Sequence, residues 1–128
     1  MDINTIKEEL LKINSYLSKC AWMDFSFHRI SVAGIQLFGS IDLCYKDYES
    51  IKIEFVQPSH INGTLYEIHI DNSKPFIEVI SKKEAKKIFG FDISEQEHVF
   101  KVNAEDDVPA WIIAESIECE ILKPPHKV

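Results

Sequence analysis

The sequence of 128 residues is poor in glycine, proline, cysteine and arginine, and it has no long apolar run. Four glycines and five prolines leave little room for linkers, so a single domain spanning residues 1–128 is expected. The short apolar runs exclude a membrane-spanning segment. The Met1-Asp2 start lacks the basic and apolar regions of a signal peptide, which predicts a cytoplasmic protein.

The cysteine pattern excludes the common thiol sites. Cys20, Cys44 and Cys119 lie far apart and form no C-x-x-C pair, so neither a zinc knuckle nor a redox dithiol is encoded. Glycine-rich phosphate loops, a G-x-S-x-G elbow and H-E-x-x-H are also absent. No cofactor is therefore expected, and the sequence does not establish that the protein is an enzyme.

What the chain does contain is a large apolar fraction and an uneven negative charge. The apolar fraction of 45% is enough for a buried core, and the formal net charge is −7. Residues 91–120, the acidic segment, hold nine acids against Lys101 alone. Such a segment repels nucleic acid and attracts basic partners, although a simple solvated surface would look the same. The candidate partner-binding residues are Asp92, Glu95, Glu97, Glu105, Asp106 and Asp107.

Hydrophobic periodicity predicts an α+β fold. Residues 3–19 have a 3.6-residue period typical of an amphipathic helix, for which Asp2, Asn4 or a Thr5–Glu8 capping box supplies the start. A period of two then predicts strands over 35–45, 51–55, 65–70, 76–80, 97–103 and 110–122. Gly34 suits a turn, Gly39 a bulge, and residues 58–63 a loop ending in Asn-Gly.

A second, short helix is expected from Ser81-Lys-Lys-Glu84 to Phe89, with Gly90 as its C-terminal cap. Its four lysines (82, 83, 86 and 87) favour a solvated helix face over a contact with nucleic acid or with an acidic protein. Residues 123–128 are expected to fray. The element order predicts an antiparallel sheet or sandwich of about seven strands, against which the first helix packs.

The stretch from Trp22 to Val32 joins the first helix to the first strand, and it holds the only arginine. Trp22, Asp24, His28 and Arg29 form a candidate functional or structural signature. We expect Trp22 to be buried together with Phe25 or Phe27. Arg29 is expected to pair with Asp24 or with a carboxylate of the acidic segment.

Two catalytic interpretations of the histidines can be weighed. Asp24, Ser26 and His28 supply the residue types of a nucleophilic site, but alternation along a strand spaces them about 7 Å apart, too far for a serine–histidine contact. His69 and Asp71, with His28 or His98, have a spacing that suits a metal site, although ordinary surface or hydrogen-bonded histidines are the more common case.

The pattern Trp22-x-Asp24-Phe25-x-Phe27-His28, followed by Ile41-Asp-Leu-Cys-Tyr45 and Ile51-Lys-Ile-Glu-Phe55, resembles a broad group of small bacterial proteins of unknown function. Some members are classed as immunity proteins of polymorphic toxin systems. The resemblance covers about the first half of the chain, and Arg29 stands where that group usually has an acid. It implies protein binding, and it supplies no catalytic set.

Three functional hypotheses follow from these patterns. The first is a cytosolic protein-binding domain, of the immunity or inhibitor type, whose acidic surface faces a basic partner. The second is a small metal-dependent hydrolase that uses His28 and His69. The third is a structural homo-oligomer.

Overall fold

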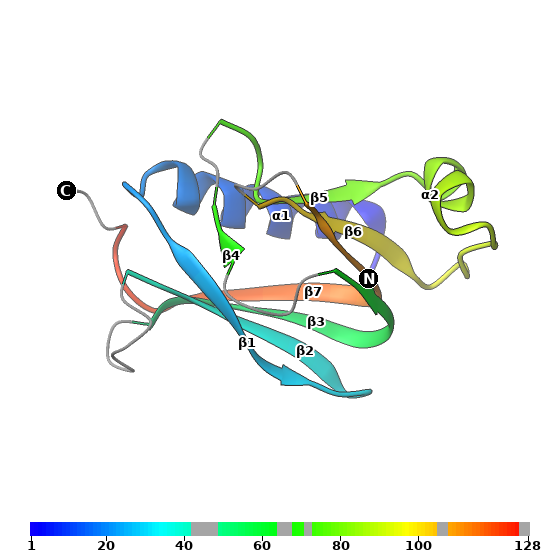
Figure 1. Cartoon of the computed structure of the whole chain (residues 1–128), viewed down its shortest axis with the longest axis horizontal. Coiled ribbons are helices and arrows are strands. Elements are labelled where there is room, and N and C mark those ends of the chain that lie inside the picture. Colours follow the sequence, from blue (N-terminus) through cyan, green and yellow to red (C-terminus); the bar gives the residue numbers. More distant parts are fainter. Residues whose placement is uncertain (42–48, 64–67, 71–72, 105–107, 126–128) are drawn as a thin grey trace.

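An amphipathic helix, α1 (Ile3–Ser18), opens the chain in the computed structural model, which describes residues 1–41, 49–63, 68–70, 73–104 and 108–125. Of the three candidate caps, Asp2 is the one used: its carboxylate accepts a hydrogen bond from the Thr5 amide at 2.9 Å. The helix buries its apolar stripe in the hollow of a curled sheet, as Figure 1 shows.

Seven antiparallel strands form this sheet, which curls into a half-barrel. Their order across the sheet is β4-β1-β2-β3-β7-β6-β5. The strands are β1 (Asp24–Ile30), β2 (Gly34–Ser40), β3 (Glu49–Asn62), β4 (Ile68–His69), β5 (Ile77–Ile80), β6 (His98–Val102) and β7 (Ala110–Ile121). The predicted α+β class, with its two helices and seven strands, is confirmed, and a single sheet takes the place of the sandwich alternative.

The sheet is built from two hairpin series joined by one long pairing. β1, β2 and β3 follow one another, and so do β5, β6 and β7. The pairing of β3 with β7 brings together residues about sixty positions apart, for example Ile53 and Cys119. Sequence periodicity predicts each of these strands but contains no information about which strand pairs with which.

β3 is longer than its sequence pattern predicts. The loop expected over 58–63 is wrong, because β3 continues through Pro58 and ends at Asn62. Two local features allow a proline here: the pairing with β7 shifts register between Pro58 and His60, and Gln57 has a positive φ of 53°. Proline lacks an amide hydrogen, and a bulge is one of the places where a strand tolerates that loss.

The short helix α2 (Lys82–Phe89) has the predicted ends. The Ser81 hydroxyl accepts a hydrogen bond from the Glu84 amide at 3.2 Å, and Gly90 closes the helix with a φ of 79°. Lys82 extends its ammonium group to the carbonyl oxygens of Ser94 and Glu95. The helix α2 packs beside β6 at one end of the sheet, away from α1 (Figure 1).

A close approach between strands β1 and β2 fills the centre of the core. Phe25 lies opposite Gly39, and a Cβ on Gly39 would come within 2.8 Å of the Phe25 ring and of Ile51. The β2–β3 register shifts between Gly39 and Ser40, but the extra residue is Ser50 on β3, so the bulge predicted at Gly39 lies on the neighbouring strand instead. Phe25 is fully buried and stacks on Phe76, with ring centroids 4.4 Å apart.

The segment after β7 is held to the body of the protein, so the fraying predicted from residue 123 is wrong for Lys123. The amides of Leu122 and Lys123 donate to the Ser50 carbonyl oxygen at 2.8 and 3.2 Å. The Tyr16 hydroxyl donates to the Lys123 carbonyl oxygen at 2.9 Å. No helix among the described residues is long and apolar enough to cross a membrane.

Candidate functional site

The outer face of the sheet, which we define as the side opposite the main core, carries a set of charged side chains on β3 and β7. Ile51, Ile53 and Phe55 point into the core, so the intervening Lys52 and Glu54 point outward. On β7 the buried Ile117 places Glu118 and Glu120 on the same outer face. The β3–β7 register sets Lys52 opposite Glu120 and Glu54 opposite Glu118.

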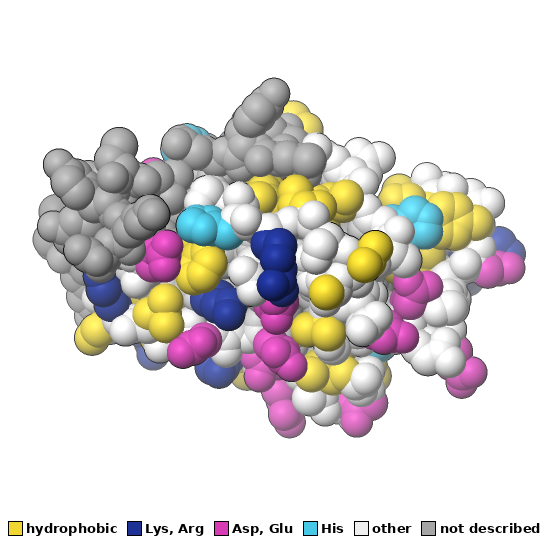
Figure 2. Space-filling model, turned by 90° about the horizontal axis from the view of Figure 1, so that it is seen from below, with side chains coloured by type: hydrophobic (Ala, Val, Ile, Leu, Met, Phe, Trp, Pro, Cys, Tyr) yellow, Lys and Arg dark blue, Asp and Glu magenta, His cyan; other side chains and the backbone are white. Residues whose placement is uncertain are grey.

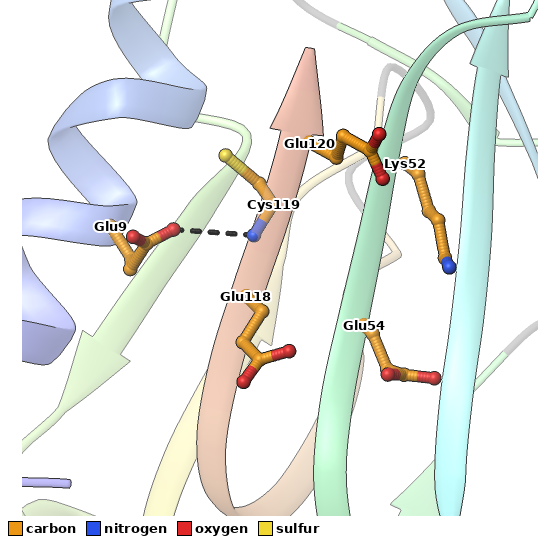
Figure 3. A pocket seen from close by; sticks show the side chains of 6 residues that line it. All are labelled: Glu9, Lys52, Glu54, Glu118, Cys119 and Glu120. Carbon is orange, nitrogen blue, oxygen red and sulfur yellow. Dashed lines mark hydrogen bonds between the residues drawn. The ribbon is translucent and has the colours of Figure 1, made fainter. Parts of the chain in front are cut away.

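A cavity of about 360 Å³ lies along these strands and reaches the side of α1. Figure 3 shows the residues that line it: Glu9, Lys52, Glu54, Glu118, Cys119 and Glu120. Four carboxylates therefore share this space with one ammonium group. Its volume falls within the usual range for ligand pockets in proteins, and its lining has a net negative charge.

Helix α1 completes one wall of the cavity because the second half of β7 extends past β6. The β6–β7 pairing covers residues 110–114 of β7 and stops there. Farther along, side chains of α1 satisfy the exposed backbone: Glu9 accepts from the Cys119 amide at 3.2 Å, and Lys12 donates to its carbonyl oxygen at 3.2 Å. Side chains thus take the place of a neighbouring strand and protect this edge.

The Glu54 carboxylate is held by two hydrogen bonds from neighbouring side chains of the sheet. Its Oε1 atom accepts from Arg29 Nη2 at 2.9 Å and from Gln36 Nε2 at 2.8 Å. Gly34 leaves the space for this arrangement, since a Cβ there would lie 3.1 Å from that same Oε1 atom. Arg29 pairs with a carboxylate as predicted, but the partner is Glu54, neither Asp24 nor a member of the acidic segment.

Glu118 and Glu120 differ from Glu54 in their surroundings. Both are exposed, and within the part of the chain that the structure describes neither forms an ion pair or a hydrogen bond. Figure 2 looks at this side of the molecule, where carboxylates in magenta gather beside basic side chains in dark blue. These two glutamates are available to an external cation.

The structure separates the members of the Trp22–Val32 stretch. Trp22 is 41% exposed, so its predicted burial is wrong; the neighbouring Met23 is buried instead, with Phe25. His28 lies at a register shift between Phe27 and Arg29 and packs edge-on against Phe38, with centroids 4.4 Å apart.

The Asp24 carboxylate pairs with the His69 ring rather than with His28. Asp24, Ser26 and His28 are therefore not joined in a catalytic row.

The acidic residues that were predicted to bind a partner differ in their contacts and in their exposure to solvent. The Glu97 carboxylate accepts from the hydroxyl groups of Ser59 and Ser94, and the Ser59 hydrogen bond holds the pKa of Glu97 below its usual value. Asp92 pairs with Lys86 at 3.0 Å, and Glu95 is exposed. Glu105, Asp106 and Asp107 lie outside the described residues.

The histidines have individual contacts. His98 is nearly buried and its Nε2 atom lies 2.9 Å from the Met1 carbonyl oxygen. Among the described residues, no three side chains of His, Cys, Asp or Glu are placed to hold one metal ion. Asp71, the partner proposed for His69 in a metal site, falls in a part of the chain that the structure does not describe.

The thiol in the cavity is kept in its protonated form. Burial raises the pKa of Cys119, and the nearby Lys12 opposes that shift. Cys20, two residues after the end of α1, is buried and donates to the Tyr16 carbonyl oxygen at 3.4 Å. Cys44 is outside the described residues. Cys119 therefore contributes packing to the cavity wall rather than a reactive thiolate.

Sequence reasoning missed the main residues of this cavity: Glu9, Lys52, Glu54, Glu118 and Glu120. A partial signal was present, because alternation places each strand's charged residues on one face. What the alternation cannot show is that β3 and β7 are neighbours. The charges that meet across this pairing come from two regions that look unrelated in the sequence.

Comparison with known proteins gives no match among family models, curated proteins or solved structures. The resemblance to immunity proteins of toxin systems remains a prediction.

Proposed function

We propose that this chain is a non-enzymatic binding domain that recognises a basic protein partner through the outer face of β3 and β7. The observation that supports the proposal is the exposed pair of glutamates, 118 and 120, which have no internal partner among the described residues and border a cavity lined by four carboxylates. Carboxylates on an open sheet face are complementary to lysine and arginine side chains.

The sheet face is better suited to this role than the loop that precedes β6. In that loop, Glu97 accepts hydrogen bonds from two serines and Asp92 pairs with Lys86, so part of its charge is already balanced. The face also belongs to paired strands, and a rigid scaffold loses less conformational entropy on binding than a loop does. The net charge of −7 would add long-range attraction toward a basic partner.

An inhibitor of a basic toxin is the form of this proposal that the N-terminal resemblance supports. A protein of that kind blocks a cationic groove with carboxylates, and fast association follows from electrostatic steering. The chemistry required of the partner is a cluster of lysine or arginine side chains on its surface.

The test is a binding titration with basic proteins encoded next to this chain's gene. Isothermal titration calorimetry at low and high salt should show binding that weakens strongly as salt is added, because surface charges are screened. The double variant Glu118→Gln/Glu120→Gln should lose most of the affinity, whereas Glu8→Gln, a charge change on the exposed side of α1, should retain it. Absence of tight binding to every basic neighbour would count against the proposal.

The homo-oligomer hypothesis makes a different prediction about mass. Solution scattering at two protein concentrations would give a mass above that of one chain, 14.8 kDa. A monomer at both concentrations would reject it without affecting the proposed binding function.

A further inference from the structure

We infer that Glu54 and Glu118 together receive one cationic side chain of the partner, and that this side chain is an arginine. The inference rests on the function proposed above and adds a contact point and a residue type to it. It depends on the register of β3 and β7, which sets these two glutamates directly opposite each other on the unpartnered outer face.

The first argument is electrostatic. Side chains directly opposite on antiparallel strands have Cβ atoms about 5 Å apart, and like charges in that position are destabilising. Arg29 and Gln36 relieve the charge of Glu54 on the β2 side, both through its Oε1 atom. On the β7 side, Glu118 has no compensating partner among the described residues. A cation from outside, placed between the two carboxylates, would remove this repulsion.

A second argument concerns the shape of the cation. Among the described residues, no three His, Cys, Asp or Glu side chains are placed to hold one metal ion. A guanidinium group donates hydrogen bonds in several directions within a plane and can therefore bridge two separate carboxylates. The cavity of about 360 Å³ has room for a long side chain.

The face itself supplies an internal precedent for this chemistry. Arg29 already places a guanidinium against Glu54 across β2, with Nη2 2.9 Å from Oε1. An arginine that approached from the β7 side would mirror the internal contact.

Two measurements on one variant test the inference. Glu118→Gln removes the like charge opposite Glu54, so its melting temperature should rise by about 1–4 °C in low salt. The same variant should bind an eight-residue oligoarginine peptide about tenfold more weakly than the wild type, because one charge-assisted contact is lost. Glu8→Gln, which removes an exposed charge on α1 that does not line this cavity, is the matched control and should change neither value.

Comparing oligoarginine with oligolysine distinguishes the possible outcomes. Wild-type protein should bind oligoarginine more tightly than oligolysine of the same length, and amide shifts in an NMR titration should follow β3 and β7. If oligoarginine binds but Glu118→Gln behaves like Glu8→Gln, the contact point is wrong while the proposed function stands. If neither peptide binds the wild type, both the inference and the basic-partner proposal fail. A lowered melting temperature for Glu118→Gln would also overturn the inference.

Discussion

The guanidinium of Arg29 on β1 reaches across β2 to the carboxylate of Glu54 on β3, with 2.9 Å between Nη2 and Oε1. The side chains are 49% and 21% exposed, so the pair is partly screened by solvent. Its position matters more than its strength, because it leaves the β7 side of Glu54 facing Glu118. This relationship connects the only arginine of the chain to the proposed binding face.

Replacing Arg29 with glutamine should destabilise the protein by about 0.2–1 kcal/mol, the range for an exposed ion pair. The loss should be larger at low salt, because Glu54 and Glu118 then repel each other with less screening. Urea unfolding at two salt concentrations measures this difference. In the double variant Arg29→Gln/Glu118→Gln part of the stability should return, and an equal loss in both backgrounds would contradict the coupling.

Replacing Gly39 with alanine should cost about 1–3 kcal/mol of unfolding free energy, because the added methyl group overpacks a filled core. Its Cβ would lie 2.8 Å from the fully buried Phe25 ring. Denaturant unfolding gives the value. The same substitution in a Phe25→Leu background should cost less, since the smaller side chain leaves space beside residue 39; an identical cost would show that the ring is not the obstacle.

Tyr16→Phe tests the anchor of the segment after β7. The lost hydrogen bond to the Lys123 carbonyl oxygen should lower stability by about 1 kcal/mol at neutral pH. Burial also raises the pKa of Tyr16 from 10.0 to about 12 in the folded protein. The protonated form is therefore favoured by folding, and this contribution is complete below pH 10.0 and is lost as the pH rises toward 12.

The wild type should accordingly lose stability between those two pH values, and Tyr16→Phe should lose less over the same interval. Thermal unfolding from pH 9 to 12 measures both curves. Parallel curves for the two proteins would show that another group is responsible for the alkaline loss.

Ser59→Ala tests the hydrogen bond that joins β3 to Glu97 in the loop before β6. The Ser59 hydroxyl donates to Glu97, and this hydrogen bond lowers the pKa of that carboxyl below its usual 4.5. A lowered pKa stabilises the fold above pH 4.5, and the contribution disappears as the pH falls through the folded-state value. The variant should therefore be less stable at pH 7 and show a shallower decline in acid.

Sequence patterns predict best those features whose determinants are neighbours in the chain. Helix α2 is an example, because the Ser81 cap, the Glu84 amide and Gly90 lie within ten positions and act through local hydrogen bonds. The faces of individual strands follow in the same way from alternation. Trp22 shows the limit: an aromatic residue next to a buried segment need not itself be buried, since which side of the chain the core covers depends on the helix–sheet junction.

The sequence by itself determined the α+β class, the two helices, the alternating faces and the excess of negative charge, since each depends on composition or on residues close together. Only the tertiary structure decided that β3 runs through Pro58, that Arg29 forms its ion pair with Glu54, and that Glu54 faces Glu118. These outcomes depend on the pairing of strands distant in sequence. That pairing is selected by the packing of the whole core, which no local pattern contains.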